Sequence, residues 1–274
     1  MLEEKRICAF IDILGFKNEV LHSDNERRTK IINLIQDIKF EDSEQSMNSE
    51  SFGFGMVSRP SAEVTSFSDN IVISSNLIPH KRTVQIGNKV QEWEESSIKF
   101  IEHIFIKIIS VFWRALHLGL LFRGGVTVGN LYHKNGVVVG EALINSYELE
   151  TNTSYPRIEV SNEVVDILKG YYKDSQIGDL DSLFLYKDDK YIVNVFCFHI
   201  GVWWDYQHIN NIQGEMEYRT IIEIVDGILN MAKINYFKYK DNNKRIADKW
   251  KWYIDTMSEE YNKGHWLKIR ESVK

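Results

Sequence analysis

Asp12 and Asp69 are the residues of this chain whose type and placement offer chemistry. Asp12 follows the apolar run 6–11 and precedes Gly15, whereas Asp69 lies within the β-rich stretch 62–75. Paired carboxylates at neighbouring strand ends can hold two divalent cations, Mn²⁺ or Mg²⁺, roughly 3.5 to 4 Å apart, and these ions clamp a phosphate between attacking and leaving oxygens. Such a pair predicts a site for a nucleoside triphosphate. The alternative is that Asp12 caps a turn and Asp69 begins a hairpin, without a catalytic role.

The first part of the chain is predicted to place both aspartates at the ends of strands. The short apolar run 6–11 suits a buried strand, and apolar residues at helical spacing predict a helix over 25–38. The stretch 41–61 is rich in Ser, Glu, Asn and Gly, so no regular structure is expected there. Residues 62–75 favour a hairpin with Asp69 at its tip.

The rest of the chain is predicted to alternate helices and strands before it becomes helical. Apolar residues three or four positions apart predict a helix over 92–118 that ends at a glycine. Asn135 and Gly136 favour a hairpin turn between strands at 121–128 and 137–140. The further expected elements are a helix at 142–150, a strand at 155–160, a hairpin with strands at 183–186 and 192–196, and two helices at 216–235 and 242–261.

The order strand, helix, hairpin, helix, strand predicts a mixed α/β (α+β) fold with the split β-α-β arrangement of ferredoxin-like or palm domains. Element order alone carries little information about function. We expect this domain to span residues 1–180 and residues 181–274 to form an appended β-hairpin and helical extension. Trp250 and Trp252 are expected to pack within that extension.

Composition and charge argue against several classes of protein. Of the 274 residues, 43% are hydrophobic and 26% are charged, which is typical of a folded globule with a sizeable core. The net charge of −6 predicts no general attraction to nucleic acid or to an anionic membrane. The longest apolar stretch, at 100–121, is interrupted by charged residues, so no membrane span is expected. The N-terminus lacks a signal-peptide pattern, and a cytoplasmic location is therefore expected.

Four segments, in the same order along the chain, resemble the class III nucleotidyl cyclases. Residues 10–16, FIDILGF, reproduce the first metal motif of that family, in which an aspartate and the carbonyl of the next residue bind metal. Residues 67–70, FSDN, stand where the family has its second metal-binding aspartate. Residues 123–129, RGGVTVG, and 140–150, GEALINSYELE, resemble a later strand and the helix that follows it.

The resemblance implies a role for each matching residue. Asp12 and Asp69 would be the catalytic metal ligands, and Ile13 would contribute its carbonyl oxygen. The two cofactor ions would be Mn²⁺ or Mg²⁺. Backbone N–H groups of the following turn would bind the phosphates, and a glycine there lets the backbone approach an anion closely. The residues of that turn are Leu14, Gly15 and Phe16.

Within that superfamily, the closer resemblance is to the pyrimidine cyclases of Pycsar antiphage defence. It is carried by FSDNIVIS from Phe67, LFRGGVTVG from Leu121, the segment 140–150, YPRI from Tyr155 and a Trp-containing helical tail, and it spans about residues 5–160. It implies cyclisation of UTP or CTP to the 3′,5′-cyclic monophosphate and pyrophosphate. It also implies a homodimer, because cyclase active sites form between two such domains and this chain contains one. A separate effector protein would read the product.

This chain departs from purine cyclases at the residues that handle ribose and base. Ungapped alignment puts Ile144 in place of the Asn that orients the ribose and Glu148 in place of the Arg that binds developing charge. Thr65 stands where adenylate cyclases read adenine with a Lys, and Val137 where they have the partner Asp. One interpretation is a catalytically inactive nucleotide-binding homologue; a palm nucleotidyltransferase is another. Retention of two close carboxylates, which repel each other, favours an active cyclase that reads a smaller base.

An active enzyme needs another cation in place of the missing Arg. Arg123 is the first candidate, because a guanidinium matches phosphate with its bidentate fork, and Arg157 and Arg59 are the next. The alternative is that Arg123 pairs with a structural carboxylate such as Glu148.

The base is expected to meet Thr65, with Tyr147 or Tyr155 available to stack on it. These tyrosines are equally explained by half-buried packing. A threonine hydroxyl either donates or accepts a hydrogen bond, so the sequence does not fix whether uracil or cytosine is preferred. The sequence favours UTP only slightly.

Overall fold

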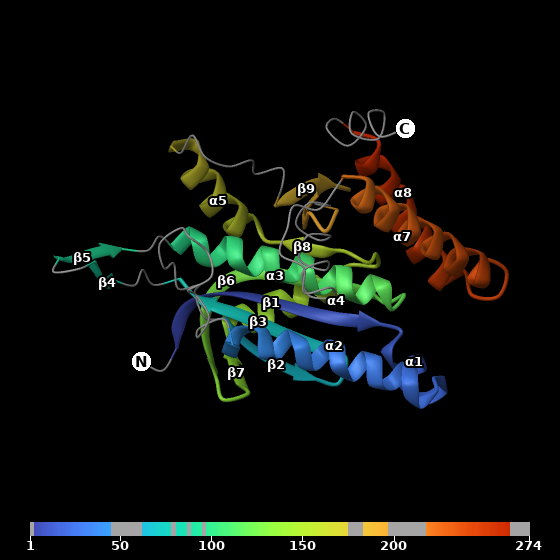
Figure 1. The fold of residues 1–274 in the computed structure, drawn as a ribbon, viewed down its shortest axis with the longest axis horizontal. Coiled ribbons are helices and arrows are strands. Elements are labelled where there is room, and N and C mark those ends of the chain that lie inside the picture. The colour runs from blue at the N-terminus through green and yellow to red at the C-terminus, as the bar shows by residue number, and fades with distance from the viewer. Residues whose placement is uncertain are drawn as a thin grey trace.

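The computed structural model describes residues 3–44, 62–77, 81–86, 89–94, 97–174, 183–196 and 218–263. An 8-stranded sheet lies at its centre, in the order β2-β3-β1-β6-β8-β10-β9 with β7 paired to β6 (Figure 1). The strands of this sheet are β1 (Glu4–Leu14), β2 (Glu63–Phe67), β3 (Asn70–Asn76), β6 (Leu121–Lys134), β7 (Val137–Gly140), β8 (Ile158–Val160), β9 (Phe184–Lys187) and β10 (Lys190–Val193). A separate 2-stranded sheet pairs β4 (Lys81–Ile86) with β5 (Lys89–Glu94).

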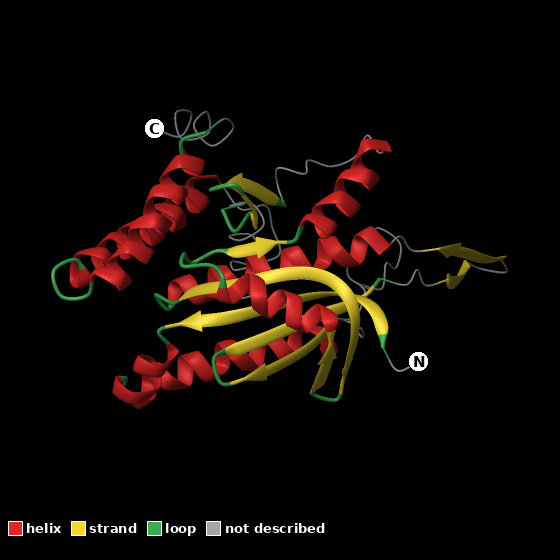
Figure 2. Ribbon diagram, turned by 180° about the vertical axis from the view of Figure 1, so that it is seen from behind, coloured by secondary structure: helices red, strands yellow, loops and turns green. Residues whose placement is uncertain are grey.

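Helices cover both faces of the large sheet (Figure 2). They are α1 (Phe16–His22), α2 (Asn25–Glu44), α3 (Ser97–His117), α4 (Glu141–Thr151), α5 (Asn162–Asp174), α7 (Tyr218–Tyr239) and α8 (Lys244–Tyr261). Alternate residues of β1 pack on opposite faces, since Ile7 and Ile11 join the main apolar cluster with α3 whereas Cys8 packs with Ala142 of α4. Among the described helices, none combines the length and apolarity that a membrane crossing requires.

The centre of the sheet contains a split β-α-β unit. β3 and β6 both pair antiparallel with β1, one on each side of it. They are therefore parallel to each other, and α3 lies on the connection between them. This topology confirms the predicted mixed α/β fold and the order of its elements.

The C-terminal helices pack against the sheet and its helices. Tyr253 of α8 is fully buried, and its ring centroid lies 6.1 Å from that of Phe112 in α3 and 5.6 Å from that of Phe196. Trp250 of α8 belongs to the same buried cluster as Ile7 of β1. These two residues come from opposite sides of the domain boundary expected at residue 180. The apolar core therefore continues across the expected domain boundary, and the division into two domains stays a prediction.

Some elements differ from the sequence-based expectation. Residues 89–94 form β5, so the helix expected from residue 92 begins at Ser97. Charged and polar side chains occupy most of positions 81–94 and obscure any strand alternation. α2 continues into the stretch 41–61, through Glu44, and the remainder of that stretch lies outside the described residues.

Four further differences concern the length or existence of elements. α1 was not expected, because it has seven residues, none of them buried, and so shows no apolar periodicity. α5 was also not expected, although Val164, Val165 and Leu168 give it a short buried stripe. β6 runs to Lys134 rather than residue 128, and strand β8 begins at Ile158 rather than residue 155.

Candidate functional site

The structure brings Asp12 and Asp69 to the same end of the sheet. Asp12 is near the end of β1, opposite Asn70 of β3, and Asp69 lies in the turn between β2 and β3. The amide N–H of Ile13 donates a 2.9 Å hydrogen bond to the carbonyl oxygen of Asp69. Because the N–H and C=O of one residue point the same way in an antiparallel pair, the Ile13 carbonyl also faces this turn.

Backbone geometry at two turns determines how these side chains are presented. Ser68 has a φ of 58°, a left-handed conformation that closes the tight β2–β3 turn before Asp69. The side-chain amide of Asn70 donates a 3.2 Å hydrogen bond to Asp69 Oδ1. Gly15 has a φ of 84° at the start of α1, with open space where a Cβ would stand. A glycine is therefore favoured at this turn, the one expected to approach phosphate.

Asp12 is partly buried and holds one strong cationic contact. Its side chain is 18% exposed, and Oδ2 lies 3.3 Å from an Nη atom of Arg123. Burial raises the pKa of the Asp12 carboxyl and the nearby Asp69 charge raises it further, while the Arg123 guanidinium opposes both effects. The charge of Asp69 therefore acts on the Asp12 carboxyl across this end of the sheet.

Arg123 links Asp12 to a second carboxylate. On β6 it stands directly opposite Asp12, forms an ion pair with Glu150 of α4, and donates a 3.2 Å hydrogen bond to the carbonyl of Thr153. Burial raises the pKa of the Glu150 carboxyl, and the charge of Asp12 adds to this effect against the guanidinium. The structural partner expected at Glu148 is instead Glu150, because Glu150 is on the buried face of α4 and Glu148 is exposed.

Lys249 is a further member of this charge cluster that the sequence did not reveal. It is a half-buried residue of α8, and its pKa is lowered by burial and by the positive charges of Arg123 and Arg245. The carboxylates of Asp12 and Glu150 oppose that shift. Packing of α8 therefore adds the Lys249 ammonium to the charge cluster that Arg123 forms with Asp12 and Glu150.

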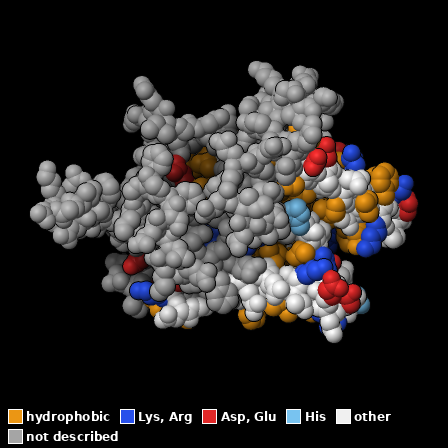
Figure 3. Space-filling model, in the orientation of Figure 1, with side chains coloured by type: hydrophobic (Ala, Val, Ile, Leu, Met, Phe, Trp, Pro, Cys, Tyr) orange, Lys and Arg blue, Asp and Glu red, His pale blue; other side chains and the backbone are white. Residues whose placement is uncertain are grey.

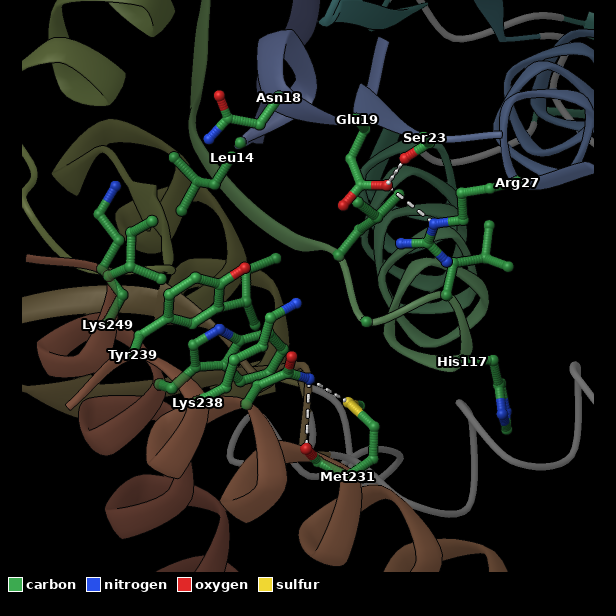
Figure 4. A pocket seen from close by; sticks show the side chains of 18 residues that line it. Leu14, Asn18, Glu19, Ser23, Arg27, His117, Met231, Lys238, Tyr239 and Lys249 are labelled. Carbon is green, nitrogen blue, oxygen red and sulfur yellow. Dashed lines mark hydrogen bonds and ion pairs between the residues drawn. The ribbon is translucent and has the colours of Figure 1, made fainter. Parts of the chain in front are cut away.

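A cavity of about 510 Å³ opens beside the turn at Leu14 and Gly15 (Figure 4). α7 and α8 form one wall of it and contribute Lys238 and Lys249, whereas α1 and α2 form another. Figure 3 shows side chains of both charge signs on the surface of this part of the molecule. The other polar side chains that line the cavity are Asn18, Glu19, Ser23, Arg27, His117, Asn235 and Tyr239.

Thr65 is part of a buried hydrogen-bond relay. Its hydroxyl lies 2.9 Å from Nε2 of His133, and Nδ1 of His133 lies 2.8 Å from the hydroxyl of Ser74. Arg6 Nε donates to the same Ser74 hydroxyl at 3.0 Å. Strand register places Thr65 opposite Val72, on the sheet face that also carries Asp12.

The other residues expected at the site are placed in different ways. Tyr147 of α4 is half-exposed, and its ring meets Phe10 edge-on with centroids 5.4 Å apart. Tyr155 stacks on Trp252 at 5.5 Å. Within the described part of the chain, Arg157 forms ion pairs with Glu159 and Asp188, at 2.7 and 3.1 Å, rather than with Asp12 or Asp69. Arg59 lies outside the described residues.

The donor atoms at this end of the sheet fit a hard divalent cation. Asp12 and Asp69 supply carboxylate oxygens and Ile13 a carbonyl oxygen, which are the ligands that Mg²⁺ and Mn²⁺ take. Among the described residues, no group of three or more His, Cys, Asp or Glu side chains gathers as a metal site. Ions here would therefore need water or phosphate oxygens to complete their coordination, as Mg²⁺ commonly does with nucleotides.

Acidification is expected to destabilise the fold through His133. Burial, together with the charge of Arg6, lowers the pKa of His133 to about 4, whereas an unfolded histidine titrates near 6.5. The stability that depends on neutral His133 is thus fully present above a pH of about 6.5 and is lost as the pH falls through about 4. The free energy of unfolding is expected to decrease by on the order of 3 kcal/mol over this range. Urea unfolding of wild type and His133→Gln across this range measures the effect. His22→Gln, at an exposed histidine, is the control, and equal slopes for wild type and His133→Gln would contradict the assignment.

Comparisons with known proteins give weak similarity to cyclase structures. No family model and no curated protein matches the chain. A bacterial light-regulated adenylyl cyclase is 15% identical with a TM-score of 0.40, covering 82% of this chain and 98% of that one. An adenylate/guanylate cyclase/hydrolase from Silicibacter pomeroyi is 13% identical with a TM-score of 0.37, over 70% and 95% of the two chains. The guanylyl cyclase Cya2 is 12% identical with a TM-score of 0.36, over 70% and 90%. Likeness at this level does not determine an activity for this chain.

Proposed function

We propose that this protein is a metal-dependent nucleotidyl cyclase that converts UTP, in preference to CTP, into the 3′,5′-cyclic monophosphate and pyrophosphate. The main support is the juxtaposition of Asp12 and Asp69 across the hydrogen bond from Ile13 N to Asp69 O, 2.9 Å long. Cations held by Asp12, Asp69 and the Ile13 carbonyl would lower the pKa of the ribose 3′-hydroxyl and neutralise the triphosphate.

The reaction forms one bond and breaks one bond at the α-phosphorus. The ribose 3′-oxygen attacks this atom, its proton passes to water, and the bond to the oxygen shared with the β-phosphorus breaks to release pyrophosphate. In this proposal Arg123, 3.3 Å from Asp12, would stabilise negative charge at that phosphorus. Lys249 from α8 adds a second positive charge near Asp12.

The relay behind Thr65 supports the preference for uracil. Arg6 always donates, so the Ser74 hydroxyl accepts from it and can donate its own hydrogen to His133 Nδ1. Neutral His133 then carries its hydrogen on Nε2 and donates it to the Thr65 oxygen. Thr65 is left with its hydrogen to donate and with one free lone pair. We propose that the hydrogen is directed at the base. Uracil O4 accepts such a bond, whereas the cytosine amino group at the same position does not.

A homodimer is part of this proposal, and exposed apolar side chains on α4 and β7 support it. Val137, Val139, Ile144 and Tyr147 are 52%, 57%, 59% and 50% exposed. Covering them with a second copy would remove apolar surface from water. Sedimentation is expected to show a dimer that Ile144→Asp shifts to monomer, while Ile234→Asp, at an exposed site on α7, leaves it unchanged. A fully active monomer would contradict this part.

The cellular setting of the proposal is antiphage signalling in the cytoplasm, with a separate effector that binds the cyclic nucleotide. Its support is the sequence resemblance of residues 5–160 to the pyrimidine cyclases of Pycsar defence.

Competition among nucleotides tests the base preference. Purified protein is incubated with Mn²⁺ and equimolar UTP, CTP, ATP and GTP, and the products are separated by chromatography. Cyclic UMP is expected as the main product. An unsatisfied polar group costs about 1 to 3 kcal/mol, which corresponds to roughly 5-fold to 150-fold discrimination against CTP. Cyclic AMP or GMP as the main product would overturn the pyrimidine assignment, and cyclic CMP alone would overturn the preference for uridine.

A further inference from the structure

A second cavity, of about 810 Å³, is lined in part by Arg123 and shares Lys249 with the cavity beside Gly15. Its lining residues come from the beginning of β6, the end of α4 with the loop that follows it, and one side of α8. Its volume lies in the range of small-molecule sites, about 300 to 1,000 Å³. The residues that line it are Arg123, Thr151, Thr153, Ser154, Tyr155, Lys244, Arg245, Asp248, Lys249, Lys251, Trp252 and Asp255.

The lining is basic in a chain whose net charge is −6. Five of the lining residues are Lys or Arg and two are Asp. Lys251 is neutralised by Asp255, with Nζ 2.6 Å from the carboxylate. Lys244 and Arg245 are exposed at the start of α8, and no ion pair with a described residue neutralises either of them. Positive charge therefore remains for an anionic ligand.

An aromatic wall accompanies these cations. Tyr155 and Trp252 stack with centroids 5.5 Å apart and ring planes 17° apart. The Trp252 indole N–H donates a 3.2 Å hydrogen bond to Asp188, which holds the indole ring in place. The Arg157 guanidinium lies over the Tyr155 ring, 5.7 Å from its centroid. Such a rigid aromatic surface, with the hydroxyls of Thr151 and Ser154 nearby, suits a planar base joined to a sugar.

We propose that this cavity is a second nucleotide site, which binds the phosphate groups of a nucleotide through Lys244, Arg245 and Lys249 and its base against Trp252. Binding here does not use Asp69 and needs no divalent cation, although it shares Arg123 and Lys249 with the proposed catalytic site. Arg123 both lines the cavity and contacts Asp12, 3.3 Å away, which makes it the link between the two sites. A phosphate in the cavity competes with Asp12 for this guanidinium.

Binding of UTP in EDTA, measured by calorimetry, tests the proposal without metal-dependent contributions. We expect binding to wild type and equal binding to Asp69→Ala, which lacks a catalytic carboxylate. Lys244→Ala and Arg245→Ala are each expected to weaken it about tenfold, because each removes one hydrogen bond to a charged group. Both side chains are exposed, and a thermal melt verifies that the variants fold. The matched control is Lys233→Ala, an exposed cation of α7 outside both cavities.

Inorganic tripolyphosphate and uridine separate the contributions of phosphate and base. UTP is expected to bind more tightly than tripolyphosphate, and uridine more weakly than both. Absence of metal-free UTP binding would overturn the proposal, as would a Lys244→Ala/Arg245→Ala double variant that binds like Lys233→Ala. Tripolyphosphate binding as tight as UTP would overturn the role of the aromatic wall and the assignment to a nucleotide.

Discussion

Replacement of Asp12 by asparagine is expected to lower the cyclase rate by at least about 10³-fold while the protein remains folded. Asparagine keeps the shape of the side chain but removes the charge that a divalent cation requires. Arg123 keeps its ion pair with Glu150, so the guanidinium is not left without a partner. Because burial and Asp69 raise the pKa of Asp12, loss of this charge is expected to leave the free energy of unfolding unchanged or slightly higher.

The rate is measured as cyclic nucleotide formed with Mn²⁺, and stability by urea unfolding. Asp226→Asn, at an exposed carboxylate of α7, is the matched control and is expected to retain the wild-type rate. Asp69→Asn is expected to behave like Asp12→Asn. Near-normal turnover by either variant would remove these carboxylates from the catalytic site.

Replacement of Gly125 by alanine is expected to destabilise the protein by about 3 kcal/mol. A Cβ at this position of β6 would overlap the carbonyl oxygen of Ser146 and would lie 2.5 Å from the Cβ of Leu149. Both atoms belong to α4, whose close packing on β6 depends on the absence of a side chain there. The backbone oxygen cannot rotate away, so the helix itself would have to move.

Urea unfolding of Gly125→Ala and Gly227→Ala gives a matched comparison. Gly227 is an exposed helical residue of α7, and no atom lies within 4 Å of the position that an added methyl group would occupy. Alanine there is therefore expected to stabilise the protein by up to about 1 kcal/mol. Equal stability of Gly125→Ala and wild type would show that α4 is not held against β6 as described.

The fold was predictable where apolar periodicity was strong. The buried face of α3, with Ile101, Phe105, Ile108 and Phe112, follows directly from spacing of three or four residues. The β2–β3 hairpin was likewise indicated by turn-forming residues around Asp69. Polar strands such as those in residues 81–94 gave no comparable signal.

The site was predictable in part, because only some of its members lie in recognisable segments. Asp12 and Asp69 are near strand ends, where short-range pattern and resemblance point to them. Glu150 and Glu148 differ by two positions on one helix, and the choice between them depends on which face of α4 packs on β6. Lys249 and His133 join the site only through tertiary packing, which local sequence does not encode.

The products that the wild-type protein forms from UTP in the presence of Mn²⁺ test the central claim most directly. Mass spectrometry of the nucleotide and an assay of released pyrophosphate are made on the same sample. The account predicts one cyclic UMP and one pyrophosphate for each UTP consumed, because the 3′-oxygen of the substrate is itself the nucleophile. UTP that binds and remains intact, or a linear dinucleotide in place of the cyclic product, would contradict it.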